Sequence, residues 1–299
     1  MNEPTIQVQS VIYQNDPASL RRTIEHLANA IRVERESVAQ LGGVKLIYGD
    51  ASPEPILTEA DLSALCAAFG ADLEIEYRFF GFNSGTAKGH NLLAEGSRAD
   101  YFMIMNPDIL MSPRTLIEMM ALMDDADTGM VEARQTPLEH PKEYDLETLE
   151  TDWATTACAL IRADVFRKLN GFDSDTFFLY CDDVDFSWRV RLAGFKVRYQ
   201  PLAPVYHAKH LDSKGKWIAT GAEVYYSAEA SLLMAHKWSN PKLVKKLLRI
   251  FSGASGAQQD AAKTFIKRRK EGTLPTPIDP EHKVASFRDW NYSGMRFVL

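Results

Sequence analysis

The sequence has few cysteines and no long apolar run. Its three cysteines, Cys66, Cys158 and Cys181, are isolated and lack the spacing of metal ligands, which excludes a disulfide framework and a zinc site. We expect them to be reduced thiols in the core of a cytoplasmic protein. The apolar runs are too short to span a bilayer, and the first residues lack the basic start and apolar stretch of a signal peptide.

Charge is distributed unevenly along the chain, and acidic residues are scarce only in its basic C-terminal part. The net charge is −6, but the stretch from Lys237 to Lys270 holds ten Lys or Arg residues and one acidic residue, a net of +9 that leaves −15 for the remainder. An acidic body with a basic C-terminal segment does not indicate nucleic-acid binding. It predicts one surface for an anionic partner, such as a membrane or a phosphorylated acceptor.

Strand and helix patterns alternate in the first third of the chain. Apolar residues predict strands at 5–14, 44–48, 73–80 and 101–105, and helical spacing follows each of the first three. This alternation predicts an α/β fold with a mostly parallel sheet, whose binding groups lie at the carboxyl ends of its strands.

Polar residues and glycines follow these four strands. Gly81, Gly85 and Gly89 have the wrong spacing for a dinucleotide fingerprint and follow the third strand, which argues against a nicotinamide dehydrogenase. Simple turn chemistry remains an alternative for these glycines. The candidate ligand-binding residues behind the strands are Tyr13, Asn15, Asp50, Asn83, Gly85, Gly89, Asn91, Asn106 and Asp108.

The stretch from Phe177 to Gly194 brings three carboxylates together. Asp182, Asp183 and Asp185 stand at the start of a short helix, in which Val184, Trp188 and Leu192 recur every four residues and predict one buried face. One aspartate there could simply cap the helix, since its free N–H groups favour a negative charge. Capping needs one carboxylate and not three, so both a catalytic role and a structural role remain open for these residues.

The C-terminal part of the chain is basic, and its pattern predicts helices. Helical spacing covers 223–237 and 241–251, and the second of these helices has apolar residues on one side and Lys242, Lys245, Lys246 and Arg249 largely off it. Two interpretations remain open: an ordinary helix packed on the body, or a helix lying on an anionic membrane, to which 267–270 would add charge.

Six motifs in order resemble family 2 glycosyltransferases, and most closely the bacterial rhamnosyltransferase branch. The resemblance covers roughly residues 5–210 and rests on Gly81–Asn91, Asn106-Pro107-Asp108, Cys158–Arg162, Gly171-Phe172-Asp173, Phe178–Arg191 and His207. It implies the GT-A fold, with a catalytic domain that we place over 1–215. The resemblance does not cover the C-terminal part, which composition and helical spacing predict to be a basic, mostly helical extension over 216–299. Within the domain, it implies a nucleotide-sugar-binding half over 1–108 and an acceptor and catalytic half over 109–215.

The resemblance also implies roles for the candidate residues. Asp183 matches the catalytic base, with Asp182 and Asp185 beside it, and like-charge repulsion there would raise the pKa of the base. Asp108 and His207 match the ligands of Mg²⁺ or Mn²⁺. Asp50 matches the acidic residue that contacts the donor base; the other donor-binding candidates are Tyr13, Asn15, Asn83, Gly85, Lys88, Gly89, Asn91 and Asn106.

One residue departs from the family pattern. Many members hold the metal with Asp-x-Asp, whereas the first of these positions is Asn106 here. An inverting transfer needs a carboxylate that takes the proton of the acceptor hydroxyl and positive charge on the departing diphosphate. A neutral amide weakens cation binding, which leaves open how strictly the reaction depends on metal.

We therefore expect an inverting glycosyltransferase that uses a dTDP- or UDP-sugar, with rhamnose as the first candidate. The expected acceptor is a saccharide or polyprenyl-linked saccharide of a bacterial surface polysaccharide such as O-antigen, and the expected location is cytoplasmic or peripheral on the inner face of the plasma membrane. The alternative is a non-catalytic nucleotide-sugar-binding or scaffold protein with the same fold. A processive synthase would carry transmembrane helices and a Gln-x-x-Arg-Trp motif, and the sequence has neither. The oligomeric state is left open.

Overall fold

The computed structural model describes residues 3–38, 41–139, 143–207 and 220–288. The strands are β1 (Ile6–Ile12), β2 (Val44–Asp50), β3 (Glu74–Phe79), β4 (Tyr101–Met105), β5 (Ile109–Met111), β6 (Thr128–Thr136), β7 (Cys158–Arg162) and β8 (Lys196–His207). The helices are α1 (Pro17–Val38), α2 (Glu59–Phe69), α3 (Gly85–Ala94), α4 (Thr115–Met123), α5 (Ala163–Lys168), α6 (Asp182–Leu192), α7 (Gly221–Lys237), α8 (Pro241–Ser252) and α9 (Ala257–Glu271).

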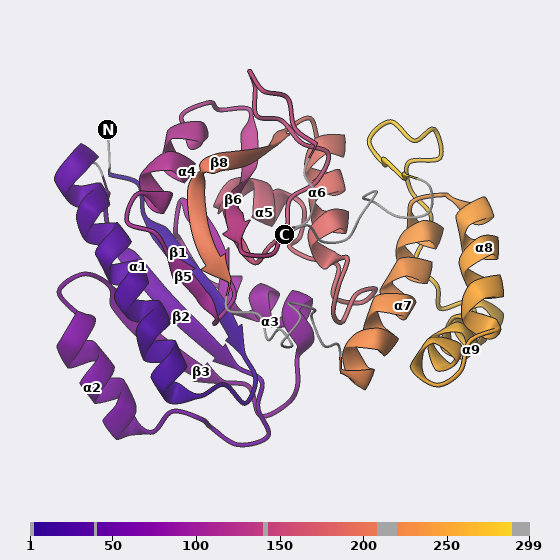
Figure 1. Cartoon of the computed structure of the whole chain (residues 1–299), viewed down its shortest axis with the longest axis horizontal. Coiled ribbons are helices and arrows are strands. Elements are labelled where there is room, and N and C mark those ends of the chain that lie inside the picture. Colours follow the sequence, from indigo (N-terminus) through magenta and orange to yellow (C-terminus); the bar gives the residue numbers. More distant parts are fainter. Residues whose placement is uncertain (1–2, 39–40, 140–142, 208–219, 289–299) are drawn as a thin grey trace.

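These strands form one sheet in the order β3-β2-β1-β4-β7-β6-β8-β5 (Figure 1). The first four strands of the chain are parallel, as the alternation of strands and helices predicts. The other half is mixed, because β7 runs antiparallel between β4 and β6 and β5 runs antiparallel to β8. The short strand β5 was not predicted, since three residues are too few to show a period.

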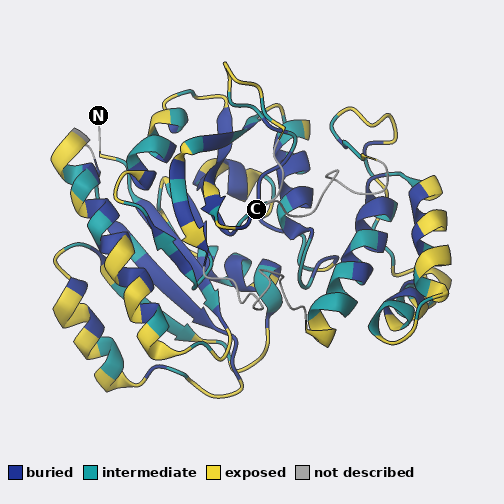
Figure 2. Cartoon of the chain, viewed as in Figure 1, coloured by how far each residue is buried: buried dark blue, intermediate teal, exposed yellow. Residues whose placement is uncertain are grey.

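Helices cover both faces of the sheet. The apolar stripe of α1 (Leu20, Ile24, Leu27, Ile31) packs with α2 and α4 on one face and forms the largest core cluster. Residues of α3, α5 and α6 pack with β4 and β7 in a second cluster. Figure 2 shows the result: the central strands β1, β2 and β4 are mostly buried, the edge strand β3 is partly exposed, and the outward sides of α1 and α2 are exposed. Two covered faces leave the ends of the strands as the accessible part of the sheet.

The C-terminal helices pack against the rest through α6. The Trp188 ring of α6 meets the Trp238 ring edge-on at 5.1 Å, and Leu233, Leu247 and Phe265 from α7, α8 and α9 share this third cluster. The helical extension is thus confirmed, with α9 as a further helix. The predicted boundary between 215 and 216 lies outside the described residues and stays a prediction.

Two sequence-based expectations are wrong. Cys66 is exposed on α2, and only Cys158 and Cys181 lie in the core. Leu192 is 44% exposed, while Asp182, Val184, Asp185, Phe186, Ser187, Trp188 and Val190 of the same helix are all buried. Helix α6 therefore has no single buried face, because the sheet packs on one side of it and the C-terminal helices on another.

Of the described helices, none combines the length and the apolar composition needed to cross a membrane.

Candidate active site

The backbone before α6 turns sharply and presents the acidic residues. Tyr180 and Cys181 both adopt left-handed conformations, with φ of 70° and 59°, and α6 begins at the next residue. Such conformations cost free energy in residues other than glycine and persist where the surroundings enforce them. Cys181 provides no side-chain cap, so the carboxylates of the first turn are the negative groups at this helix N-terminus.

Asp182 is the buried member of the adjacent pair. Its side chain is 5% exposed, and Thr86 Oγ1 donates a hydrogen bond to Oδ2 at 3.0 Å. Burial, and then the negative charge of Asp183, raise the pKa of Asp182 to about 7, against the effect of the Thr86 hydrogen bond. Asp183 is only half-buried. A raised pKa is thus found for Asp182, and Asp183, whose Oδ1 accepts from Val184 N at 2.8 Å, stays the predicted base.

Asp185 differs from both. It is fully buried: Lys237 Nζ lies 2.6 Å from its Oδ1, Trp238 Nε1 donates to the same oxygen at 3.0 Å, and Arg189 Nε lies 2.8 Å from Oδ2. Its two oxygens are occupied by these partners in the protein interior. This arrangement contradicts a direct catalytic role for Asp185 and makes it part of the contact between α6 and α7.

Asp108 and His207 are brought together by strand pairing. Ile109 of β5 lies opposite His207 at the end of β8, so the residue before β5 falls beside the histidine ring. His207 Nε2 lies 3.2 Å from Asp108 Oδ1, and His207 Nδ1 lies 2.7 Å from Gln135 Oε1. The histidine is buried and the Asp108 side chain is 37% exposed. The sequence predicted this pair as metal ligands without showing that the two residues meet.

The chemistry of this pair fits a divalent cation. Gln135 Nε2 donates to Thr155 Oγ1 at 3.2 Å, which leaves Gln135 Oε1 to accept from His207 Nδ1–H. In the neutral ring, Nε2 then carries a lone pair directed at Asp108 Oδ1. Two acceptors at this distance repel unless a proton or a cation lies between them, and a ligand histidine held through its other nitrogen is common around metals. No group of three His, Cys, Asp or Glu ligands occurs among the described residues, so diphosphate or water oxygens would complete the coordination.

A short segment before β7 is hydrogen-bonded to groups that lie beside both candidate sites. Thr155 accepts the hydrogen bond from Gln135, the residue that contacts His207. Ala154 N donates to Ser187 Oγ at 3.0 Å, and Ser187 Oγ donates to the backbone carbonyl oxygen of Asp183 at 2.8 Å. A chain of hydrogen bonds through 154–155 therefore links the backbone of Asp183 to the side chain that contacts His207.

Side-chain oxygens accept hydrogen bonds from backbone N–H groups in the loops behind β1 and β2, and one of these bonds joins the two loops. Gln14 N donates to Ser52 Oγ at 2.7 Å, and Asn15 Oδ1 accepts from Tyr13 N at 2.9 Å, with the Tyr13 side chain 47% exposed. Asp50 is fully buried and accepts from Ser52 N at 2.8 Å, from Ile56 N at 3.0 Å and from the Tyr77 hydroxyl. Asp50 thus shapes the loop after β2, and its contact with a donor base stays a prediction.

Several candidates on α3 pack this helix against its neighbours. Gly85 has φ of 64°, and a Cβ there would lie 2.3 Å from the Phe178 carbonyl oxygen. A Cβ on Gly89 would lie 2.6 Å from Val11 Cγ2. Asn91 exchanges two hydrogen bonds with the Phe172 backbone, at 2.8 and 2.9 Å. These three residues let α3 approach β1 and the segment before α6, which explains them without a ligand.

The remaining donor-binding candidates each make one contact that we describe. Asn83 Oδ1 accepts from Gly85 N at 3.1 Å at the start of α3. Lys88 Nζ lies 5.0 Å above the Phe82 ring, and Asn106 N donates to Ala157 O at 2.8 Å. Sequence reasoning missed Gln135 and Thr86. Gln135 could have been found from the sequence, because it is a polar residue at the end of a predicted apolar strand.

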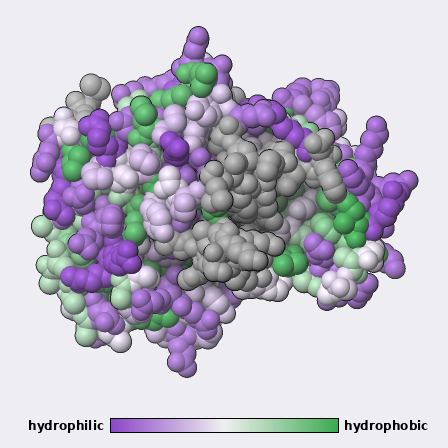
Figure 3. All heavy atoms as spheres, viewed as in Figure 1, coloured by the Kyte–Doolittle hydropathy of each residue, from purple (hydrophilic) through white to green (hydrophobic). Residues whose placement is uncertain are grey.

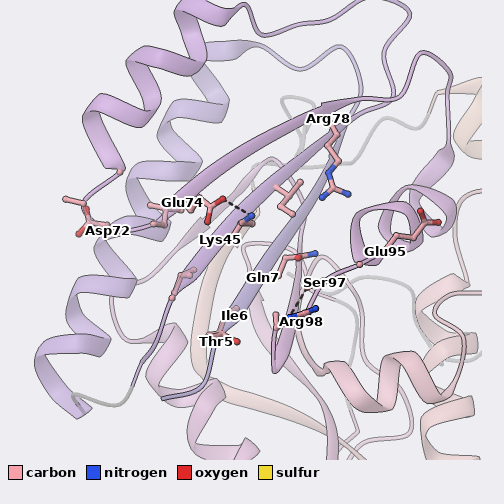
Figure 4. Close-up of a pocket in the computed structure, with 18 of the residues that line it drawn as sticks. Thr5, Ile6, Gln7, Lys45, Asp72, Glu74, Arg78, Glu95, Ser97 and Arg98 are labelled. Atoms are coloured by element: carbon pink, nitrogen blue, oxygen red, sulfur yellow. Dashed lines mark hydrogen bonds and ion pairs between the residues drawn. The ribbon is translucent and has the colours of Figure 1, made fainter. Parts of the chain in front are cut away.

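A cavity of about 630 Å³ lies elsewhere, at the amino ends of β1, β2 and β3 (Figure 4). Figure 4 shows Gln7, Lys45 and Arg78 on its sheet side. Lys45 Nζ lies 2.7 Å from Glu74 Oε1, so the charges on its wall largely compensate one another. This cavity contains none of the candidate catalytic residues.

Known proteins similar to the chain are glycosyltransferases, although no family model matches it. Rhamnosyltransferase WbbL of Escherichia coli K12 is 27% identical and matches over 38% of this chain and 54% of its own length. An N-acetylglucosaminyl-diphospho-decaprenol L-rhamnosyltransferase of Mycobacterium tuberculosis is 39% identical over 19% of this chain and 18% of its own length. The pre-mycofactocin glycosyltransferase of that species is 25% identical and matches over 70% of this chain and 47% of its own length. The chain thus spans about half the length, or less, of these relatives.

Solved structures agree on the fold. A mannosyltransferase of Pyrobaculum calidifontis, in complex with GDP-mannose and Mn²⁺, superposes with a TM-score of 0.55 at 14% identity, over 90% of this chain and 81% of its own. GalNAc-T7 with UDP, GalNAc and Mn²⁺ superposes with a TM-score of 0.62 at 12% identity, over 94% of this chain and 57% of its own. The chain therefore has the GT-A fold of the nucleotide-sugar glycosyltransferases. The resemblance to family 2 glycosyltransferases seen in its motifs is confirmed, since its relatives and structural neighbours are glycosyltransferases.

Proposed function

We propose that the protein is an inverting glycosyltransferase that moves a sugar from a nucleoside-diphosphate donor to a hydroxyl group of a saccharide or lipid-linked saccharide. The observation that carries this proposal is the chain of hydrogen bonds through residues 154–155, which links groups that lie beside two candidate sites. One site is the half-buried Asp183 beside Asp182, and the other is the Asp108–His207 pair.

The proposed reaction is a single displacement. The acceptor oxygen forms a bond to the anomeric carbon, the bond from that carbon to the diphosphate oxygen breaks, and the acceptor proton passes to the carboxylate of Asp183. Asp182, which is protonated in part near neutral pH, lowers the negative charge beside the base. A divalent cation held by Asp108 and His207 would supply positive charge to the leaving diphosphate.

The identities of donor, metal and acceptor are inferred from the relatives. Two of them are rhamnosyltransferases, and the name of one specifies a decaprenol-linked acceptor. We therefore place a dTDP- or UDP-linked rhamnose first among donors and a polyprenyl-linked saccharide of a bacterial surface polysaccharide, such as O-antigen, first among acceptors. Both neighbouring structures contain Mn²⁺, which favours Mn²⁺ or Mg²⁺ here.

We further propose that the molecule meets an anionic membrane through α8. Leu243, Val244 and Leu247 are buried against the other C-terminal helices, as the packed-helix interpretation predicts. Lys242, Lys245, Lys246 and Arg249 of α8 are exposed, and Figure 3 shows hydrophilic side chains at the outer edge of this region with hydrophobic ones beside them. This surface would act mainly by charge, because most apolar residues of α8 are packed inward and only Ile250, at 39% exposure, is an exposed large hydrophobic residue there.

The test is release of nucleoside diphosphate from a panel of dTDP-, UDP- and GDP-sugars with Mn²⁺, without acceptor. A transferase should hydrolyse its donor slowly, and Asp183→Asn should abolish this release while the protein remains folded. A scaffold protein of the same fold would bind a nucleotide sugar and release nothing, and that result would refute the proposal.

A further inference from the structure

Helix α7 lies along the segment that carries the candidate base (Figure 1). At its amino end, Glu223 Oε1 accepts from the Tyr180 hydroxyl at 3.2 Å, and the Tyr226 ring lies 4.7 Å from the Phe178 ring. At its carboxyl end, Lys237 reaches α6 itself. The helix therefore contacts the acidic stretch both before and after Asp182 and Asp183.

Lys237 bridges two acidic residues in the protein interior. Its side chain is 7% exposed, and Nζ lies 2.6 Å from Asp185 Oδ1 and 2.6 Å from Asp173 Oδ2. The carboxylate of Asp185 also faces Arg189, which donates to the carbonyl oxygens of Leu169 at 2.9 Å and Gly171 at 2.8 Å. The network thus joins α7, α6 and the turn at 169–173.

Asp185 belongs to the first turn of α6, which also carries the adjacent aspartate pair. Its backbone N–H donates to Cys181 O at 2.9 Å and closes the turn that contains Asp182 and Asp183. The side-chain contacts of Asp185 therefore restrain the orientation of the turn, together with the hydrogen bonds from Thr86 to Asp182 and from Ser187 to the Asp183 carbonyl oxygen.

Resting on the proposed transferase function, we infer that Lys237 is a positioning residue that holds the first turn of α6, and with it Asp183, in the orientation needed for catalysis. The side chain of Lys237 is buried and its Nζ contacts the carboxylates of Asp173 and Asp185, so we assign it no contact with substrate. It acts through Asp185, whose buried charge would otherwise lack its closest partner. Displacement of a catalytic group by about 1 Å can cost on the order of 10²-fold in rate. The C-terminal helices thereby become part of the catalytic apparatus.

The first experiment does not depend on activity. Amide hydrogen exchange is compared in the full chain for wild type, Lys237→Met, Lys237→Arg and the control Lys196→Met. Lys196 also bridges two carboxylates, at 3.2 and 3.7 Å, but lies at the start of β8. We expect exchange at residues 183–186 to become at least about tenfold faster in Lys237→Met only. Unchanged exchange there would overturn the inference whatever the protein catalyses.

The second experiment separates positioning from stability. With the donor that releases most nucleoside diphosphate in the panel, Lys237→Met should lower kcat by about 10- to 100-fold while the Kd of the nucleoside diphosphate with Mn²⁺ stays unchanged. Lys237→Arg should recover most of the rate.

A double variant resolves the case in which Lys237→Met is poorly folded. Asp185→Asn with Lys237→Met removes one charge of each sign from the network, so that Arg189 and Asp173 remain as one positive and one negative group. We expect this variant to regain stability and keep the low kcat. A kcat restored together with stability would show a structural role only. If wild type releases no diphosphate from any donor, the transferase proposal fails and the catalytic part of the inference fails with it, while the exchange experiment still decides whether Lys237 orders the first turn of α6.

Discussion

His207 Nε2 lies 3.2 Å from Asp108 Oδ1, although β6, β7 and several helices separate the two residues in the chain. The antiparallel pairing of β5 with the end of β8 produces this contact, and Gln135 orients the ring from the other side. A nitrogen lone pair and a carboxylate oxygen at this distance need a proton or a cation between them, and we propose that a divalent cation takes this place.

We expect Asp108→Asn and His207→Ala to abolish the Mn²⁺-dependent rise in Tm that a nucleoside diphosphate produces. A ligand present at 100 times its Kd stabilises a protein by about 2.7 kcal/mol, so the loss should be easy to measure by thermal shift. Gln135→Leu should weaken Mn²⁺ binding by roughly 10- to 100-fold, since it removes the acceptor that orients the ring. His282→Ala, at an exposed position in the C-terminal part of the chain, is the control. A full Mn²⁺ response in His207→Ala would contradict the assignment.

Asp183→Asn should lower kcat by a factor of about 10² to 10⁴ with little change in Tm, because it removes the proton acceptor from a half-buried position. Asp182→Asn should have a smaller effect on kcat, since its side chain is buried against Thr86. Steady-state release of nucleoside diphosphate from the best donor measures both. The reverse ranking of the two variants would mean that Asp182 is the base.

Stability should decrease with rising pH because of Asp182. Its carboxyl has an ordinary pKa of 3.8, and burial in the folded protein raises it to about 7. Between these values the unfolded chain has released the proton and the folded chain still holds it, so the free energy of unfolding falls as the pH rises through this window. Asp182→Asn should lose this dependence, so that its stability relative to wild type increases from pH 4 to pH 7 and is constant above. Urea unfolding at several pH values, without metal, measures the difference; parallel curves would contradict the prediction.

Gly85→Ala should destabilise the protein more than Gly96→Ala. Both glycines have positive φ, at 64° and 70°, but an added Cβ meets the Phe178 carbonyl at 2.3 Å at Gly85 and nothing within 4 Å at Gly96. The control therefore isolates the cost of the left-handed backbone, roughly 1–2 kcal/mol, and the clash adds about 1–3 kcal/mol at Gly85. Equal losses in urea unfolding would show that the close approach of α3 to Phe178 is not maintained in solution.

Replacing Lys242, Lys245, Lys246 and Arg249 by glutamine should weaken binding to phosphatidylglycerol vesicles. Each removed cation contributes about 1 kcal/mol near an anionic surface. Vesicle sedimentation in low salt measures the change, with phosphatidylcholine vesicles as the neutral comparison. The matched control is Lys263→Gln with Lys267→Gln, since these lysines of α9 are paired with Asp260 and Glu271. Equal binding of all variants would exclude α8 as the contact surface.

Local patterns predicted much of the fold. The apolar spacing of α1 and the alternation in β1 are properties of neighbouring residues, so their helix and strand could be predicted along with the parallel half of the sheet. The antiparallel insertion of β7 was not predictable in this way, because the direction of a strand depends on its connections and partners. The exposure of Leu192 was missed for a related reason: periodicity locates an apolar face but not every partner that covers a helix.

The sequence by itself determined which residue types stand where chemistry is needed: carboxylates at the start of α6, and polar residues behind the strands that alternate with helices. Only the tertiary structure decided their separate states. Asp182, Asp183 and Asp185 are nearly indistinguishable as sequence, yet one is buried against Thr86, one is half-buried and one is held by Lys237. The physical reason is that burial and ion pairing depend on groups far away in the chain, which periodicity over a few residues does not record.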